Sequence, residues 1–146
     1  MTPKELRRGS DRKGNIVQDI LAARAKSANL SSRKQVKLFL EQYVADVPVE
    51  DLEGRSTEIM ARIALSHLDF GATRRKGQVK LRIYNPTERE HGYTSAYTFI
   101  EMVNDDMPFL VNSVSAAINR HDLGVHITVH PIIRVKRDAK GKIRSL

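Results

Sequence analysis

The chain has 146 residues, 40% of them hydrophobic and 29% charged, a composition typical of a soluble globular protein with one core. It contains no Cys, which excludes a disulfide framework and a thiolate zinc site and fits a reducing compartment. The formal net charge of +8 makes a basic nucleic-acid-binding module one alternative, although the basic residues gather at chain ends and strand edges rather than in one stripe.

The N-terminal half of the chain is predicted to be helical. Residues 1–14 are polar and are expected to be flexible, and they lack the apolar segment of a signal peptide. A first amphipathic helix is predicted from residue 15 to about residue 28. No run is long enough to span a membrane, so we expect a cytoplasmic protein with no membrane partner.

Serine caps predict where two further helices begin. Either Ser31 or Ser32 caps the second helix and Ser56 caps the third. Pro48 marks the end of the second helix and Gly71 the end of the third. The apolar faces expected for these helices are Val36, Phe39, Leu40, Tyr43 and Val44 in the second, and Ile59, Met60, Ile63, Ala64 and His67 in the third.

After Gly77 the period of the sequence changes from that of a helix to that of a strand. The predicted elements are strands over 79–84, 97–103 and 124–135, a helix over 108–122, a hairpin turn over 139–142 and a fourth strand that begins at Ile143.

Together these elements predict an α+β protein. A helical segment over residues 15–77 precedes a partial ferredoxin-like sheet unit over 78–146, in which strand, helix and strand form a right-handed βαβ crossover. The fourth strand begins so close to the last residue that we expect the unit to be truncated there and the parent chain to continue.

The most informative segment is the junction between the second strand and the following helix. Its residues are Asn104, Asp105, Asp106, Met107, Pro108 and Phe109. In one interpretation, Asp105 or Asp106 caps the helix, Pro108 sets φ, and Phe109 with the two residues after it fills the core. In the other, the free N–H groups of the helix N-terminus bind an anionic or zwitterionic ligand.

His126 and His130 form an H-x-x-x-H pattern within the predicted third strand. In a strand, four residues separate their Cα atoms by roughly 13 Å, so we expect an interface and no metal site. The chain has no G-x-G-x-x-G and no G-x-x-x-x-G-K-[ST] motif, so no dinucleotide cofactor is expected in it. No set of residues forms an interpretable catalytic arrangement.

RNA binding through the sheet is the second class of function that the pattern allows. It requires exposed aromatic side chains on the central strands, and the candidates are Tyr84, Tyr97 and Phe99. Residues 125–135 contain no aromatic residue, and aromatics make up only 5% of the chain. Nucleic-acid binding therefore stays an alternative and is not the main prediction.

Residues 79–141 resemble the N-terminal region of the large bacterial NAD-specific glutamate dehydrogenases. The segment NDDMPFLV over 104–111 and the pair His130-Pro131 are the most specific parts of the resemblance. The other residues that carry it are Val79, Arg82, Ile83, Tyr84, Asn85, Pro86, His91, Gly92, Thr98, Glu101, Val103, Asn119, Arg120, Gly124, His126, Arg137 and Gly141, with a weaker helical match at Tyr43, Asp51, Leu52, Arg55, Ala64, His67 and Leu68.

The resemblance implies a very large parent enzyme that converts L-glutamate and NAD to 2-oxoglutarate, ammonia and NADH. It implies that the catalytic region lies far C-terminal to this segment, so that residues 1–146 hold no catalytic residue and no cofactor, and NAD belongs to the parent. The region similar to this one is ACT-like, which implies a regulatory or assembly role in a homo-oligomer. The partners so implied are the remainder of the polypeptide and an amino-acid effector.

The resemblance also directs attention to Phe109. The Asp106-Met107-Pro108 turn looks like the ligand turn of ACT domains, in which Gly usually follows the proline and lets the backbone approach an amino acid. This chain has Phe109 at that position. We therefore expect the turn to have an interdomain or packing role.

Overall fold

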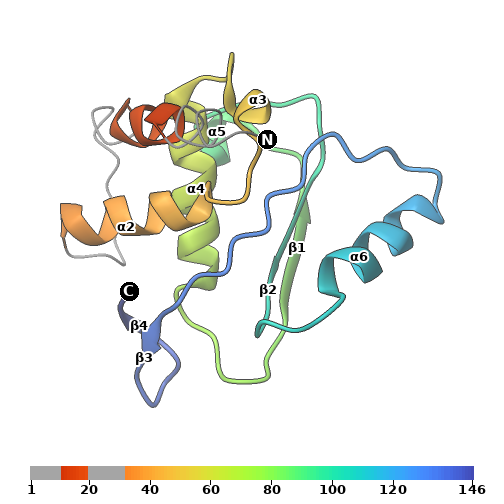
Figure 1. The fold of residues 1–146 in the computed structure, drawn as a ribbon. Helices are drawn as coiled ribbons and strands as arrows, with labels where there is room; N and C mark the ends of the chain where they lie inside the picture. Colours follow the sequence, from red (N-terminus) through yellow and green to blue (C-terminus); the bar gives the residue numbers. More distant parts are fainter. Residues whose placement is uncertain (1–10, 20–31) are drawn as a thin grey trace, which may run out of the picture.

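The computed structural model describes residues 11–19 and 32–146 of the chain. Figure 1 shows the β1–β2 hairpin standing between α4 on one side and α6 on the other. The elements are a helix over residues 11–19, α2 (Arg33–Tyr43), α3 (Val49–Leu52), α4 (Thr57–Gly71), β1 (Lys80–Tyr84), α5 (Glu88–His91), β2 (Phe99–Val103), α6 (Leu110–Asn119), β3 (Lys136–Arg137) and β4 (Ile143–Ser145).

The first two predicted helices differ from the structure only at their boundaries. The first begins at residue 11 instead of 15, and its predicted second half lies outside the described residues. The hydroxyl of Ser32 accepts a hydrogen bond from the Gln35 N–H at 3.2 Å, which makes Ser32 the N-cap of α2. All five apolar residues predicted for its face are buried. Pro48 does not end α2 but precedes the short helix α3.

Helix α4 begins where the sequence predicts, but a different face of it is buried. The Ser56 hydroxyl accepts a hydrogen bond from the Ile59 N–H at 3.4 Å, which confirms Ser56 as the N-cap. Ile59 itself is 38% exposed, so its predicted place in the core is wrong. The buried residues are Ala61, Ala64, Leu65, Leu68 and Gly71. The small alanines of this stripe allow the helices of the core to pack closely.

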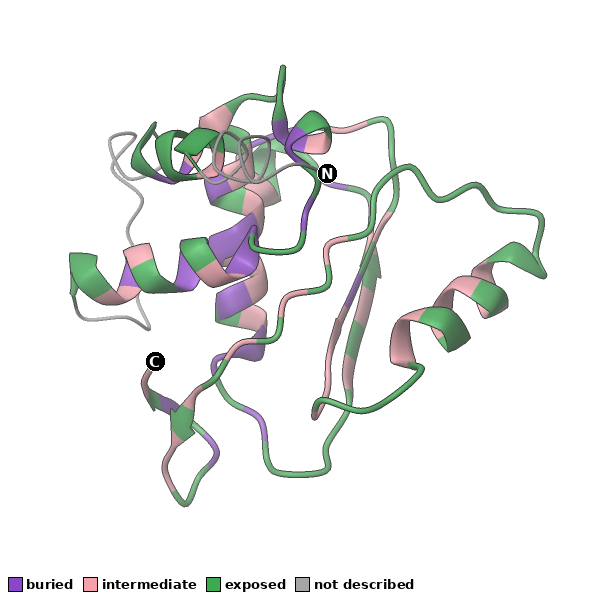
Figure 2. Cartoon of the chain, in the orientation of Figure 1, coloured by how far each residue is buried: buried purple, intermediate pink, exposed green. Residues whose placement is uncertain are grey.

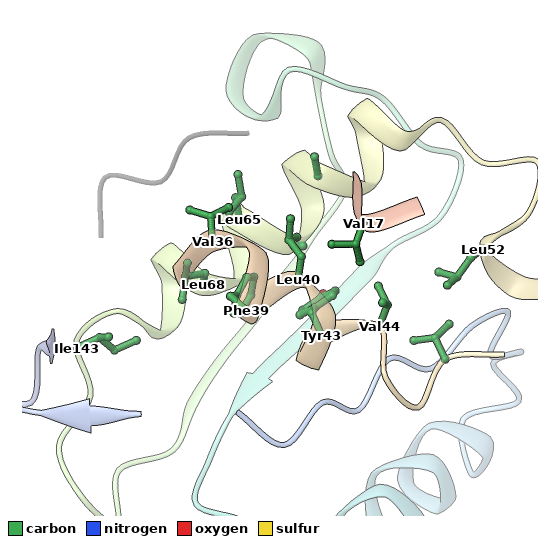
Figure 3. Close-up of a cluster of buried hydrophobic side chains, with 13 residues drawn as sticks. Val17, Val36, Phe39, Leu40, Tyr43, Val44, Leu52, Leu65, Leu68 and Ile143 are labelled. Carbon is green, nitrogen blue, oxygen red and sulfur yellow. The ribbon is translucent and has the colours of Figure 1, made fainter. Parts of the chain in front are cut away.

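The hydrophobic core lies between the helices and not on the sheet. Figure 3 shows Leu65 and Leu68 of α4 beside Phe39 and Leu40 of α2, with Ile143 of β4 at one end of the cluster. Figure 2 shows buried residues concentrated in α2 and α4, whereas α6 buries none of its residues. The helical residues and the C-terminal hairpin therefore share one core, while the proposed domain boundary at residues 77 and 78 stays a prediction.

The strands form two separate antiparallel pairs. β1 pairs with β2, which places Leu81 opposite Met102 and Arg82 opposite Glu101. β3 pairs with β4 across a turn in which Asp138 Oδ1 accepts hydrogen bonds from two main-chain N–H groups. Gly141 completes this turn with a φ of 82°, which an L side chain rarely adopts. The predicted hairpin and the first, second and fourth strands are therefore confirmed.

The predicted third strand is absent, although the α+β class is correct. Residues 124–135 carry no assigned strand, and only Lys136–Arg137 pairs with β4, so α6 does not lead into a crossover. The physical reason is that an alternating pattern needs a partner edge to become a strand. Here Val129, Ile133 and Val135 pack against the helical core instead.

The β1–β2 hairpin turns its polar face toward α4. Alternation usually places the apolar side of a strand against the core, yet Leu81 is 54% exposed and Ile83 is 62% exposed. On the opposite face, the Arg82 guanidinium donates to the main-chain and side-chain oxygens of Ser66 at 3.2 and 2.8 Å. It also lies over the Phe70 ring, 4.6 Å from the ring centre.

A buried carboxylate explains this orientation. Glu101 is only 5% exposed. Its Oε2 accepts a hydrogen bond from Arg82 Nε at 2.5 Å, and its Oε1 accepts one from the Tyr84 hydroxyl at 2.8 Å. Because a buried charge is tolerated only when it is paired and hydrogen-bonded, the strand face that carries Arg82 and Tyr84 must turn inward with Glu101.

Removing the Glu101 carboxylate should therefore destabilise the fold. We expect Glu101→Ala to lower the free energy of unfolding by about 2–4 kcal/mol, because Arg82 then lies without its partner in a site where its side chain is only 30% exposed. Urea denaturation followed by circular dichroism measures this difference. The control is Glu58→Ala, which breaks the exposed Arg62–Glu58 pair and should cost about 0.5 kcal/mol or less. Equal losses in the two variants would contradict the buried-pair explanation.

Candidate functional site

A cavity of about 210 Å³ lies beside the junction between β2 and α6. Its walls come from α2, α4, the end of β2, residues 104–106 and residues 129–137. The lining residues are Phe39, Tyr43, His67, Leu68, Gly71, Arg74, Met102, Val103, Asn104, Asp105, Asp106, Leu110, Val129, His130, Pro131, Ile132, Ile133, Val135, Arg137 and Ile143. Most of these side chains are apolar and only a few are charged, as is usual for a site that binds a small molecule.

Arg74 holds one of the junction carboxylates. Its Nη2 donates to Asp105 Oδ1, and its Nη1 donates to the Gln78 carbonyl at 2.8 Å. The Gly77 N–H donates to Asp105 Oδ2 at 2.9 Å. These bonds, led by the one from Arg74, hold the pKa of Asp105 below its ordinary value. Asp105 is therefore bound to the segment before β1, and the prediction that it caps α6 is wrong.

Arg137 joins the C-terminal hairpin to the end of α4 near the same cavity. Its guanidinium donates to the carbonyls of Gly71 at 2.9 Å, Ala72 at 3.2 Å and Gly141 at 2.8 Å. Burial, reinforced by the neighbouring Arg74 charge, lowers the pKa of Arg137. Neither arginine was identified as a candidate from the sequence, since their partners are main-chain oxygens and a carboxylate distant along the chain.

Helix α6 begins without a side-chain cap. Its N-cap is Phe109, which has a φ of 62° and no side-chain hydrogen bond, so the helix starts at Leu110 and not at Pro108. Phe109 is 76% exposed, so the prediction that it fills the core is wrong as well. The sequence predicts that Phe109, in place of Gly, favours an interdomain or packing role. Phe109 nevertheless adopts the left-handed backbone conformation that favours Gly.

The cavity brings together some of the predicted site residues and leaves others out. Asn104, Asp105 and Asp106 line it, and so does His130 from the other wall. Within the described part of the chain, neither Asp106 nor His130 has a hydrogen-bond or ion-pair partner. Both groups are therefore available to a ligand, unlike Asp105.

The remaining predicted residues lie away from the lining. His126 is not part of the cavity and packs on Tyr97, with 4.3 Å between the ring centres. Met107 and Pro108 are exposed outside it, and the Met107 sulfur accepts a hydrogen bond from the Asn104 amide at 3.2 Å. Of the two histidines predicted to share an interface, His130 therefore lines the cavity, whereas His126 lies outside it against Tyr97.

Comparison with known proteins identifies the family. The family model described as "Glutamate dehydrogenase, ACT1 domain" matches residues 39–146, about three quarters of the chain. The chain belongs to this family. It is 28% identical over 134 residues to an NAD-specific glutamate dehydrogenase of Pseudomonas aeruginosa, a match that covers 92% of this chain and 8% of the relative. It is 34% identical over 112 residues to an NAD-specific glutamate dehydrogenase of Halomonas elongata, covering 77% and 7%.

The chain thus spans less than a tenth of the length of the curated relatives it matches. No solved structure matches it. Every residue that lines the cavity lies within the range that the ACT1 model matches. The resemblance read from the NDDMPFLV segment is confirmed at the level of the family.

Two further observations concern the part of the chain that the structure describes. Over residues 11–19 and 32–146, no three His, Asp or Glu side chains gather as a metal ion would require. In the same ranges, no helix is long and apolar enough to cross a membrane.

His67 bridges α2 and β2 at the inner wall of the cavity. Its Nε2 lies 3.3 Å from the Met102 carbonyl, and its Nδ1 lies 3.3 Å from the Tyr43 hydroxyl. Because the carbonyl only accepts, Nε2 carries the proton and Nδ1 accepts from Tyr43. Burial lowers the pKa of His67 below its ordinary value of 6.5, although the Glu101 charge acts in the opposite direction. The neutral ring is therefore the form that the fold selects.

The preference of the folded state for a neutral His67 ring should make stability depend on pH. Because the pKa of His67 is lower in the folded state, its contribution to stability is complete above pH 6.5 and is lost as the pH falls toward the folded-state pKa. We expect the free energy of unfolding of the unsubstituted chain to decrease from pH 7 to pH 5. The substitution His67→Gln should make this decrease with pH smaller. Urea titrations at several pH values measure it. His121→Gln, at an exposed histidine, should leave the slope unchanged.

The left-handed Phe109 gives a second prediction. Phe109→Gly should be about 0.5–1 kcal/mol more stable than Phe109→Ala, because both remove the exposed ring but only Gly relieves the positive φ. The matched pair is Leu38→Gly and Leu38→Ala within α2, where Gly should be the less stable by about 1 kcal/mol. Thermal and urea unfolding of the four variants decide the order. The same order at both sites would show that residue 109 is not left-handed in solution.

Proposed function

We propose that this chain is the regulatory and assembly region of a cytoplasmic, homo-oligomeric NAD-dependent glutamate dehydrogenase. The parent would oxidise L-glutamate with NAD to 2-oxoglutarate, ammonia and NADH. The family match over residues 39–146 carries this proposal, together with two relatives that are NAD-specific glutamate dehydrogenases. NAD would bind elsewhere in the parent, because this sequence has none of the glycine motifs that cradle a dinucleotide.

Within the proposal the chain itself is not catalytic. The charged groups held most firmly near the cavity serve the fold, since Arg74 and Arg137 donate to main-chain carbonyls of three different segments. A catalytic base or acid needs a free position facing its substrate. These arginines instead stabilise the cavity wall, as expected in a region that binds an effector and has no catalytic role.

The cavity suits a small zwitterionic effector with an apolar side chain. Asp106 offers an unpaired carboxylate to an ammonium group. The uncapped first turn of α6 offers N–H groups to a carboxylate, and Leu110 of that turn lines the cavity. Phe39, Leu68 and Ile133 offer an apolar surface to the side chain. An amino acid combines these three features.

Nothing in the findings supports the nucleic-acid alternative. Tyr84 lies stacked on His91, with 4.7 Å between ring centres, and its hydroxyl binds Glu101. Phe99 packs between Tyr84 and Tyr93. Two of the three aromatic residues that would stack on bases are therefore already occupied on the face toward α4.

Titration with the common amino acids tests the effector site. At least one with an aliphatic or small apolar side chain should raise the melting temperature of the chain saturably, since a ligand at 100 times its Kd adds about 2.7 kcal/mol to stability. Asp106→Asn should weaken that binding at least tenfold. The matched control is Glu50→Gln, which changes an exposed carboxylate on α3 outside the cavity. This variant should bind the amino acid as tightly as the unsubstituted chain does.

The same effector should change the rate of glutamate-dependent NADH formation by the full-length polypeptide. A flat thermal response to every amino acid would remove the effector site. Absence of glutamate-dependent NAD reduction by the full-length polypeptide would overturn the assignment of the parent activity.

A further inference from the structure

The β1–β2 hairpin exposes a continuous apolar face. Leu81 and Ile83 of β1 lie on this face, and β2 adds Ile100, which is 42% exposed and pairs directly opposite Ile83. Val79 continues the face beyond the start of β1 and is 54% exposed. Figure 2 shows exposed residues alternating with more buried ones along the hairpin. We call Val79, Leu81, Ile83 and Ile100 the outer hairpin face.

Among the described residues, no helix or strand packs closely on this face. Helix α6 stands beside the hairpin in Figure 1, buries none of its residues and makes no major contact with either strand. A two-stranded hairpin is marginally stable unless a second layer covers it. Contiguous apolar surface of this kind marks an interaction site in a soluble protein.

Charge argues against a second copy as the layer that covers it. Each chain carries a formal net charge of +8, so two copies would bring like charges together. Arg75 and Lys76 are exposed four and three positions before Val79 and add positive charge at the same end of the hairpin. The face therefore favours a partner that is apolar at its centre and acidic at its margin.

The length of the relatives supplies the source of such a partner. This chain aligns with only 8% and 7% of two NAD-specific glutamate dehydrogenases, so more than nine-tenths of each relative lies outside the aligned region. A contact within one polypeptide also avoids most of the entropy that separate molecules lose on association.

We propose that the outer hairpin face binds an apolar, acid-flanked segment of the parent polypeptide outside residues 1–146. This proposal rests on the proposed function, since it requires a longer parent, and it identifies the surface through which the region joins that parent. The outer hairpin face becomes an interdomain contact, and the hairpin gains the second layer that residues 11–19 and 32–146 do not provide.

Cysteine labelling tests the proposal, because the chain has no Cys of its own. Ile83→Cys should react quickly with a maleimide in the 146-residue chain and at least tenfold more slowly in the full-length polypeptide, with the labelled peptide quantified by mass spectrometry. Ile100→Cys, on the same face, should behave alike if one substitution disturbs folding. Leu38→Cys is the matched control, since Leu38 is an apolar residue on α2 that is 40% exposed, close to the 42% of Ile100. Its labelling rates in the 146-residue chain and in the full-length polypeptide should agree within about threefold.

Each outcome bears on the proposal. Equal labelling of Ile83→Cys in the chain and in the full-length polypeptide overturns it, and so does equal protection of Leu38→Cys. Protection that appears in the isolated chain and grows with its concentration identifies a second copy and also overturns it. Adding Lys76→Glu to full-length Ile83→Cys should raise the maleimide labelling rate at least threefold, because it weakens the contact with an acidic partner. An unchanged rate overturns the proposal that the partner has an acidic margin. Glutamate oxidation measured on the same samples tests the proposed function separately.

Discussion

The buried pair of Arg82 and Glu101 decides how the hairpin sits in this structure. Glu101 is almost fully buried, and it is tolerated there because Arg82 and the Tyr84 hydroxyl both bind it. Arg82 reaches on to Ser66 of α4, so the same contact fixes the hairpin to the helical core. Since side chains alternate along a strand, drawing these residues inward necessarily turns Leu81 and Ile83 outward. The exposed apolar face is thus a consequence of where the charge is buried.

A second charged pair acts in the same way at the end of β2. Arg74 and the Gly77 N–H occupy both oxygens of Asp105, so this carboxylate cannot cap α6. The helix therefore starts from an uncapped Phe109, and the next carboxylate, Asp106, lies free at the cavity. One buried arginine thereby creates the two features that an effector would use, a free carboxylate and free N–H groups. The junction that marks the family in sequence obtains its shape from Arg74, which lies 31 positions before Asp105.

The sequence predicts the features that depend on neighbouring residues. Ser32 and Ser56 cap their helices because a cap acts over three residues, and β1 and β2 follow from local alternation. The predictions that are wrong concern residues whose structure depends on distant partners. Residues 124–135 have a strand pattern but no strand edge to pair with, and smaller residues of α4 are buried in the core instead of Ile59. Asp105 binds Arg74 instead of capping a helix. Of the cavity residues, Asn104, Asp105 and Asp106 were predicted as a site and His130 as an interface residue, whereas the hydrogen bonds of Arg74, Arg137 and His67 depend on the fold.

The two proposed surfaces are physically linked through β2. Ile100 belongs to the outer hairpin face, Glu101 anchors the strand to α4, and the strand leads directly into the cavity residues Asn104 and Asp106. His67 adds a second attachment, because it binds the Met102 carbonyl from the cavity wall. A ligand that moved residues 104–106 would therefore displace the strand that carries the proposed contact with the parent polypeptide. Coupling between effector and enzyme requires one element that both contacts bias, and β2 would satisfy this condition if both proposed contacts form.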